Sequence, residues 1–589
     1  MKPVIQIISD RISEAIQKAT GQNVAAIVTP ATDAKFGDYQ SNNALALAKQ
    51  LKANPRQLAE KIIAELEIDD ICQKPEIAGA GFINLRLKPE FVTKYLSDIK
   101  NDKENLGIEK TKKPQTVVVD FSGPNIAKQM HVGHLRSTII GDCICRMLKQ
   151  AGWNVIPQNH IGDWGTQFGM LCALFDKKIT ITKHNIANMN FLSSEEVLGE
   201  LEGFYKEAKI LFDSDENFAK TARAAVVGLH SGEGIWLTYW KHIVDYSERH
   251  YEKIYNNLNV TLTNEDIRGE SFYREKLADV VNDLKKAGIA VESEGAICVF
   301  PEGFKTKEGN PMPFIIQKTD GAFLYATTDL AALRYRINER HADEIIYVTD
   351  ARQKQHFEML FKVAEMAGWK KDTKLVHITF GSVLGEDGKP LKTRSGENVK
   401  LKELLDEAVK RAKQVVEEKN PELAESEKEN IAQSVGIGAV KYADYSNNRT
   451  SDYIFSFDKM LAMDGNTAPY MQYAYARVKS IMRKGNVDEA ELHDIKQIHL
   501  NEPAEFELAK QLIRYSEAFN TAIADFKPNF LTAYLYDLAG KFSAFYNACP
   551  VLDAEPKIRA SRLLLCDLTA QTIRHGLENL LGIKTIERM

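Results

Sequence analysis

The chain has 589 residues, of which 44% are hydrophobic and 27% charged, and its formal net charge is −5. This size predicts three to five domains of an ordinary globular protein, and no apolar run approaches the roughly 18 residues of a membrane helix. Seven scattered cysteines without a C-x-x-C pair argue against a disulfide framework and predict reduced thiols in the cytoplasm. Because the net charge is negative, any RNA contact must come from local basic surfaces.

The first region of the chain has a mixed α+β pattern. Helical spacing at 5–18 and 42–66 predicts helices, and alternating apolar residues at 76–87 predict a short strand pair. The polar stretch KNDKENLGIEKTKKP that follows predicts a linker to the next domain.

The remaining patterns predict a multidomain α/β protein. Four short apolar runs, TVVVD, GWNVIPQNHIG, FIIQK and DEIIYVTD, alternate with helical stretches and are expected to form one doubly wound parallel sheet. Aromatic residues recur at helical spacing in the segment that interrupts them, so we expect these aromatics in a helical core. The expected domains are 1–112 (α+β), 113–176 with 293–385 (the parallel layer), 177–292 (a helical insertion), 386–435 (a basic loop and stem helices) and 436–589 (all-helical).

One strand, loop and helix gathers polar residues where a ligand would bind. The β-branched run from Thr116 to Asp120 predicts a buried strand, Gly123-Pro124 predicts a loop, and apolar stripes from about His131 predict a helix. Free N–H groups and the positive dipole end at the start of such a helix suit a phosphate group.

Two histidines lie on the first turn of that helix. His131 and His134 are three residues apart and can both donate to phosphate oxygens. Gly133 between them leaves room for a nucleotide near the backbone, and Lys128 adds a positive charge. A zinc pair or two surface histidines are the alternatives, but no Cys or His cluster at a matching spacing completes a metal site.

The sequence His131-Val132-Gly133-His134 resembles the HIGH motif of class I aminoacyl-tRNA synthetases. The longer stretch PNIAKQMHVGHLRSTIIGD, whose motif runs from Pro124 to His134, is similar to that of arginyl-tRNA synthetases, and the resemblance continues in patches over almost the whole chain. It implies ATP-dependent ligation of L-arginine to tRNA(Arg) through an arginyl-adenylate, with release of AMP and pyrophosphate. It also implies a monomer with a Rossmann-type catalytic domain, a tRNA-corner-binding N-terminal domain and an anticodon-binding helical end. Mg²⁺ is expected to accompany ATP, and no structural metal is implied.

A glycine-rich basic loop follows the last expected strand. Its segment Lys392-Thr393-Arg394-Ser395-Gly396 is similar to the KMSKS loop of class I synthetases, which implies that Lys392 and Arg394 bind ATP. Ser395 stands where that pattern has its second lysine, and the resemblance implies that Lys128 supplies the missing charge. A solvated basic hairpin is the alternative, because GEDGK is a common turn.

Selection of arginine requires a carboxylate that pairs with a guanidinium. Tyr325 and Asp329 are spaced i,i+4, and the resemblance implies that they contact the substrate side chain together with Gln353. It also implies that Asn125 and Gln167 hold the amino and carboxylate end of the substrate. Without the resemblance, the favoured alternatives are a helix cap for Asp329 and a core aromatic for Tyr325.

A second polar turn, NHIGDWGTQFG, follows an expected strand, which is the crevice position for ligands in α/β sheets. His160 in this turn is a candidate contact for ATP or arginine, and a buried structural histidine is the alternative. Asp163 and Trp164 lie in the same turn.

Contacts with tRNA are implied at both ends of the chain, where aromatic side chains could stack on unpaired bases. The alternative for the aromatic residues in both regions is that they pack in the protein core. About half of the candidate tyrosines in the last domain are expected to do so. The candidates are Phe36, Tyr39, Gln40 and Asn42 in the first domain, and Tyr470, Gln472, Tyr473, Tyr475, Arg477, Lys479, Arg574 and Met589 in the last.

Three other functions are alternatives to an arginine ligase. A nucleotidyltransferase with a HIGH-type site would need no helical RNA-binding end. An RNA-binding protein without catalysis would not need His131, His134, Lys128 and Lys392 together. Specificity for lysine or glutamine is disfavoured by the pairing of Asp329 with Tyr325.

Overall fold

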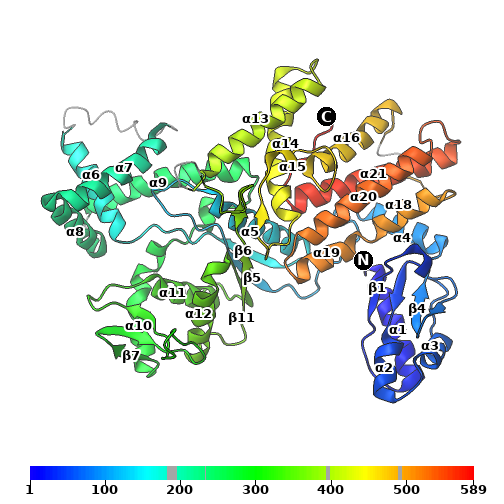
Figure 1. The fold of residues 1–589 in the computed structure, drawn as a ribbon, viewed down its shortest axis with the longest axis horizontal. Helices are drawn as coiled ribbons and strands as arrows, with labels where there is room; N and C mark the ends of the chain where they lie inside the picture. Colours follow the sequence, from blue (N-terminus) through cyan, green and yellow to red (C-terminus); the bar gives the residue numbers. More distant parts are fainter. Residues whose placement is uncertain (182–195, 233, 393–397, 489–491, 493, 496) are drawn as a thin grey trace. The chain divides into compact units, whose positions relative to one another are not determined.

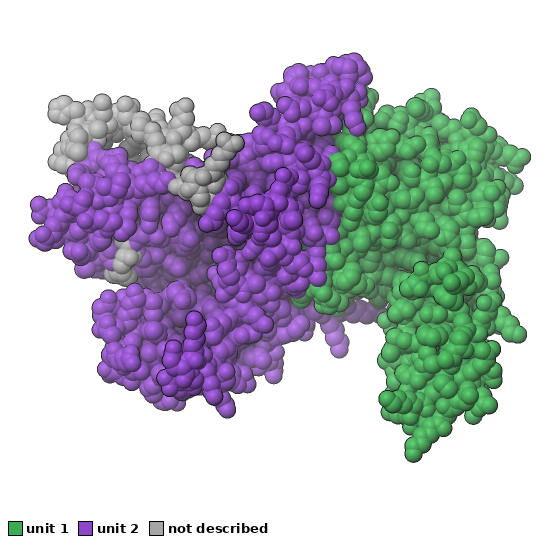
Figure 2. Space-filling view, in the orientation of Figure 1, with its two compact units in different colours: residues 1–111, 462–580, 584–589 green, residues 112–461, 581–583 purple. Residues whose placement is uncertain are grey.

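The computed structural model describes residues 1–589 apart from 182–195, 233, 393–397, 489–491, 493 and 496. The chain divides into two compact units, coloured separately in Figure 2. Unit 1 contains Met1–Thr111, Ala462–Leu580 and Lys584–Met589, and unit 2 contains Lys112–Leu461 and Leu581–Ile583. In the part of the chain that is described, every helix is too short or too polar to traverse a membrane. All seven cysteines, each in that part, are buried free thiols.

A four-stranded parallel sheet forms the centre of unit 2. Its strand order is β11-β10-β5-β6, and every neighbouring pair is parallel. Parallel neighbours require crossover connections, and helices supply them here. The strands are β5 (Thr116–Asp120), β6 (Asn154–Gln158), β10 (Glu344–Asp350) and β11 (Lys374–Phe380), and the connecting helices include α5 (Val132–Gln150) between β5 and β6 and α12 (Lys354–Met366) between β10 and β11.

Helix α5 is buried on nearly every side, and its expected apolar stripes lie in the core. Two charged residues on it are therefore paired, because an isolated buried charge is costly. Arg136 forms a buried ion pair with Asp444 at 2.9 Å and also donates to the carbonyl of Gly381 at 2.8 Å. Asp142 pairs with Arg146 at 2.7 Å. These contacts fix the helix that carries the two histidines.

The run FIIQK does not belong to the parallel sheet, so that prediction was wrong. It forms β9 (Phe314–Gln317), which pairs antiparallel with β8 (Ala296–Val299) beside β7 (Ala290–Ser293) in a separate sheet. Its alternation explains the difference: Phe314 and Ile316 are buried whereas Ile315 is 40% exposed. One covered face is typical of antiparallel sheets, and strands of a parallel sheet are covered on both faces. This sheet packs with α10 (Leu277–Lys286) and α11 (Tyr325–Asn338).

The insertion is helical, as expected, and its tyrosines contribute to its core. Tyr239, Tyr246, Tyr251 and Tyr255 on its longest helix are all buried. Figure 1 shows the helices grouped together in cyan and green. They are α6 (Thr166–Ile181), α7 (Glu196–Ser214), α8 (Glu216–Ser231) and α9 (Gly234–Asn257). The later part of unit 2 contains β12 (Val383–Leu384), α13 (Leu401–Lys419), α14 (Glu425–Tyr445), β13 (Tyr453–Ile454) and α15 (Phe457–Met460).

The N-terminal part of unit 1 is an antiparallel sheet with helices. The expected helix at 42–66 is interrupted at Asn54-Pro55, because Asn54 caps a new helix by accepting from the N–H groups of Arg56 and Gln57. The strand pair expected at 76–87 is confirmed as β3 and β4. The elements are α1 (Val4–Thr20), α2 (Asn43–Leu51), α3 (Pro55–Ala64) and α4 (Pro89–Asn101), with strands in the order β1 (Val28–Pro30), β2 (Tyr39–Ser41), β4 (Phe82–Leu85) and β3 (Glu76–Ala78).

The rest of unit 1 is a helical array, as expected for the end of the chain. Helices α18 and α20 pack on one another, and α16 packs on α21. The helices are α16 (Ala468–Lys484), α18 (Pro503–Ile513), α19 (Tyr515–Ala524), α20 (Asn529–Ala548) and α21 (Pro556–Arg574).

Candidate active site

The two histidines form a capping box at the start of α5. The N–H of Gly133 donates to Nδ1 of His131 at 3.0 Å, and the N–H of His131 donates to Nδ1 of His134 at 3.1 Å. A backbone N–H can only donate, so each Nδ1 is an acceptor and each neutral ring carries its proton on Nε2. Both histidines therefore cap the helix with one nitrogen and keep the other as a hydrogen-bond donor.

The electrostatic surroundings keep these imidazoles neutral. Burial lowers the pKa of His131, and Arg352 and Lys128 lower this pKa further. Burial and the neighbouring His131 lower the pKa of His134 to about 3. At neutral pH the turn therefore offers two Nε2–H donors at a helix N-terminus, without a fixed charge on either ring.

The structure explains why residue 133 is a glycine, which the spacing of the histidines alone did not reveal. A Cβ at this position would lie 2.7 Å from Cε1 and 2.9 Å from Nδ1 of His131. The glycine thus makes room for the imidazole to fold back onto the helix.

We expect Gly133→Ala to push the His131 ring out of its cap. Loss of a helix N-cap costs about 1 kcal/mol, and the displaced ring would no longer aim its Nε2–H at a phosphate. The measurements are thermal unfolding and the turnover of ATP-dependent catalysis, with Gly203→Ala as control, because a Cβ at Gly203 meets nothing within 4 Å. Unchanged turnover in Gly133→Ala would contradict this reading.

Helix α9 of the insertion holds the loop before the histidines. The hydroxyl of Tyr251 donates to the carbonyls of Asn125 at 2.6 Å and Lys128 at 3.1 Å. The N–H of Ala127, which has a φ of 63°, donates to Ser247 at 3.2 Å. Asn125 and Lys128 are exposed on a loop whose backbone is fixed from outside, a role of Tyr251 that the sequence analysis missed.

The base of the lysine-bearing loop is hydrogen-bonded to the histidine turn. The N–H of Val132 donates to the carbonyl of Val399, and the N–H of Leu401 donates to the carbonyl of Met130, both at 2.9 Å. Lys392 is exposed and forms a bridge with Asn398, one residue before Val399. Lys392 therefore lies close to the segment that is hydrogen-bonded to the histidine turn, whereas Arg394 lies outside the described residues.

Asp329 lies between two histidines in unit 2. Nε2 of His356 is 2.6 Å from one carboxylate oxygen, and Nε2 of His160 is 3.7 Å from the other. Nδ1 of His160 bonds the carbonyl of Arg268 at 2.9 Å, which fixes its ring. Asp329 is inside α11 rather than at its cap, which is Leu324. The helix-cap alternative for Asp329 therefore does not hold.

Tyr325 and His356 complete this group. Tyr325 is the first residue of α11, its side chain is 64% exposed, and its ring centroid is 5.2 Å from that of His356. Tyr325 is thus not a core aromatic. His356 lies three residues after Gln353, which is exposed just before α12, and it was missed although its segment was recognised.

A second carboxyl, that of Glu270, lies near Asp329, and Glu248 lies near Asp163. Burial raises the pKa of Glu270 to about 7, although His160 opposes the shift, and Asp163 and Asp329 add to it. Burial, followed by Asp245 and Asp163, raises the pKa of Glu248 to about 7. Because Asp163 and Asp329 both act on the Glu270 carboxyl, the surroundings of Asp329 favour a positively charged ligand group. Glu270 is not among the residues expected from the sequence, because the turn RGESFY that carries it has no periodic pattern.

The other expected residues of this site lie around it. Asn125 forms a backbone bridge with Gly162, and a Cβ at Gly162 would lie 2.4 Å from the side-chain oxygen of Asn125. Gln167 is half-buried near the start of α6. Asp163 accepts from the N–H of Ser271 at 2.8 Å and from its hydroxyl at 2.5 Å, so it positions the segment that carries Glu270.

The expected tRNA contacts in unit 1 divide into buried and accessible side chains. Tyr39 is fully buried, and its hydroxyl donates to Glu517 at 2.8 Å, which matches the packed-aromatic alternative. Gln472 and Tyr475 are also buried, and Gln472 donates to the carbonyl of Lys584 at 2.7 Å. The accessible candidates are Phe36, Gln40, Asn42, Tyr470, Tyr473, Arg477, Lys479, Arg574 and Met589.

Comparison with known families agrees with this geometry. Residues 95–457 match the family described as tRNA synthetases class I (R), catalytic domain, residues 471–589 match the DALR anticodon binding domain, and residues 6–87 match the arginyl tRNA synthetase N terminal domain. The parallel sheet with its histidine turn is therefore the catalytic domain of a class I aminoacyl-tRNA synthetase.

Individual relatives show which family of class I synthetases the chain resembles. The arginine–tRNA ligase of Picosynechococcus sp. is 50% identical, with 100% of both chains covered. The arginyl-tRNA synthetase structures from Plasmodium falciparum and Thermus thermophilus superpose with TM-scores of 0.84 and 0.79 at 32% and 25% identity, again with 100% of both chains covered. The chain belongs to the arginyl-tRNA synthetase family.

Proposed function

We propose that the described side chains of unit 2 carry out the family's reaction, the ATP-dependent ligation of L-arginine to tRNA(Arg). One observation carries the proposal: two neutral imidazoles with free Nε2–H donors lie directly beside the base of a lysine-bearing loop. A bound triphosphate carries negative oxygens along its length, so it requires hydrogen-bond donors and positive charges from two sides.

The first step is attack of the arginine carboxylate on the α-phosphorus of ATP, with pyrophosphate as the leaving group. Such transfer depends on in-line positioning and on stabilising the charge that develops on the phosphate oxygens. In the proposal His131 and His134 donate Nε2–H to these oxygens, with Gly133 beside them. Lys128 and Lys392 supply positive charge from the two loops. In the second step the arginyl group passes to a terminal ribose hydroxyl of tRNA, and AMP leaves.

The acidic group around Asp329 is proposed to select the substrate side chain. A guanidinium carries five donors in a rigid fork, so it can pair with Asp329 and Glu270 together. Tyr325 lies beside His356 at this group, His160 orients Asp329, and Gln353 is assigned to the substrate side chain by the family resemblance. The family resemblance assigns Asn125 and Gln167 to the amino and carboxylate end of arginine. Asn125 lies on the loop before the histidine turn, and its backbone bridges Gly162, five residues before Gln167.

The affinity for arginine is expected to rise with pH. The pKa of Glu270 is raised to about 7, so this carboxyl is largely protonated below pH 7 and negative above it. Arginine stays positive throughout, so its KM should fall between pH 6 and pH 8, and binding should release a proton. Steady-state kinetics at several pH values test this. Glu270→Gln should remove most of the dependence, and a pH-independent KM in the parent enzyme would contradict the assignment.

The proposal also covers the substrates, the metal ion and the domain organisation of the enzyme. ATP and tRNA(Arg) follow from the family, and Mg²⁺ is proposed to arrive with the ATP phosphates. Among the described residues no three metal-binding side chains cluster. We propose that unit 1 presents Phe36, Gln40 and Asn42 to the corner of tRNA and the accessible residues of α16 to the anticodon. The domain boundaries expected from the sequence, a monomeric state and a cytoplasmic location remain part of this proposal.

The decisive experiment is charging of tRNA with each of arginine, lysine and glutamine, together with ATP–pyrophosphate exchange with and without tRNA. Arginine-dependent charging is expected, and exchange is expected to require tRNA. Charging with lysine or glutamine at a comparable rate would sink the assignment of the acidic group.

A further inference from the structure

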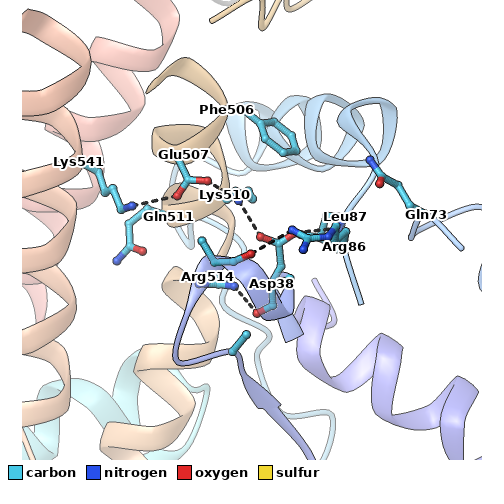
Figure 3. Close-up of a pocket in the computed structure, with 13 residues that line it drawn as sticks. Asp38, Gln73, Arg86, Leu87, Phe506, Glu507, Lys510, Gln511, Arg514 and Lys541 are labelled. Carbon is cyan, nitrogen blue, oxygen red and sulfur yellow. Dashed lines mark hydrogen bonds and ion pairs between the residues drawn. The ribbon is translucent and has the colours of Figure 1, made fainter. Parts of the chain in front are cut away.

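A cavity of about 420 Å³ lies inside unit 1, and the reaction described above leaves it without a role. Figure 3 shows its wall. One side comes from the turn between β1 and β2 and from the end of β4, and the other side comes from α18, α20 and the start of α19. Its volume is in the range of roughly 300–1,000 Å³ typical of pockets for small molecules.

The charged side chains of this cavity are mostly positive. Arg86, Lys510, Arg514 and Lys541 line it, and Asp38 and Glu507 are its two carboxylates. Four positive charges against two negative charges leave an excess of two. An excess of this size in a partly enclosed polar pocket attracts an anion.

Two of the cations are held in place by backbone carbonyls. The guanidinium of Arg86 donates to the carbonyls of Ala34 at 3.0 Å and Lys35 at 2.7 Å, and no described carboxylate forms an ion pair with it. Arg514 donates to the carbonyl of Asp38 at 2.8 Å. A carbonyl does not neutralise a guanidinium, so the charge of Arg86 remains available to an anion, whereas Arg514 also faces the carboxylates of Glu517 and Asp38.

The two lysines share their carboxylates. Lys510 lies 2.7 Å from Asp38 and 2.5 Å from Glu507, and Lys541 lies 2.9 Å from the other oxygen of Glu507. Figure 3 shows this chain of contacts from Lys541 through Glu507 and Lys510 to Asp38. The Lys541 side chain is 43% exposed, so it can turn toward a ligand that enters the cavity.

We propose that this cavity binds a phosphate group. Arginine and lysine side chains are the usual phosphate ligands, and an excess of two charges matches one phosphate dianion or two successive phosphates of a nucleic-acid backbone. The phosphate comes either from a free phosphorylated molecule or from the backbone of the RNA partner. The second source depends on the proposed function, and the first does not.

Lys541 is the residue to change, because it is partly exposed and outside the reaction's machinery. The first probe is inorganic phosphate at constant ionic strength, read as the shift in Tm. We expect phosphate to raise the Tm of the parent protein, Lys541→Gln to lose at least half of this rise, and Lys541→Arg to restore it. Lys61→Gln on α3 is the matched control, because Lys61 is exposed in the same unit and does not line the cavity.

The second probe is tRNA(Arg), with its affinity measured across salt concentrations. If the phosphate belongs to RNA, Lys541→Gln should lower the slope of log K against log salt by about 1. A changed Tm response with an unchanged slope identifies a free phosphorylated ligand. Equal Tm responses and equal slopes in all four proteins overturn the proposal. A failure of the proposed function can be distinguished from a failure of the phosphate site. In that case the parent protein would not charge tRNA with arginine.

Discussion

His134→Ala is expected to lower the turnover of aminoacylation by about 10²–10³-fold, which corresponds to roughly 2.7–4 kcal/mol of lost transition-state stabilisation. The reason is the loss of an Nε2–H donor whose position is fixed by the hydrogen bond that Nδ1 accepts from the N–H of His131. The measurement is kcat for charging of tRNA(Arg) at saturating substrates. Turnover equal to that of the parent enzyme would remove His134 from the phosphate site.

A matched variant separates catalysis from helix stability in this experiment. His134 occupies the third helical position of a capping box, where glutamine is a natural acceptor for the N–H of the capping residue. His134→Gln should therefore keep the Tm close to that of the parent protein and still lose most of the turnover. At the cap, His131→Asn should behave in the same way, because asparagine is a good N-cap but is too short to reach the phosphate.

Asp329→Asn is expected to raise the KM for arginine by on the order of 10²-fold, because removing one partner of a buried charge pair costs about 2–5 kcal/mol. The amide keeps the shape of the side chain and can still accept from His356. The KM for ATP should change little. Steady-state kinetics for both substrates test this, with Asp372→Asn as an exposed control in unit 2. Equal losses for arginine and ATP would contradict a role in selecting the amino acid.

Local sequence patterns were sufficient to predict the strand and the helix that form the reaction centre. The β-branched run at Thr116–Asp120 and the helical stripes after His131 define β5 and α5, because burial of one strand and one helix is encoded in adjacent residues. The run FIIQK shows the limit of this reasoning. A short apolar run predicts a buried strand, but its partner strands are decided elsewhere in the chain, and here they lie in the antiparallel sheet.

Side-chain roles were harder to predict than elements. The spacing of Tyr39 and Tyr475 fits a stacking platform and a packed core equally well, and only the tertiary fold buries them. His356 and Glu270 could not be placed beside Asp329 from sequence, because the three residues belong to separate helical elements that only the tertiary fold brings together. The capping role of His131 and His134 was also hidden, since it depends on the direction in which each ring folds.

The hydrogen bonds that join Val132 to Val399 and Leu401 to Met130 connect segments very far apart in the sequence. During synthesis on the ribosome, the histidine turn emerges long before its partner segment does. Translation proceeds at roughly 5–20 residues per second, so many seconds pass between synthesis of the histidine turn and synthesis of that partner segment. A nascent chain that ends before Val399 can hold the first strands of the sheet but cannot assemble a competent nucleotide site.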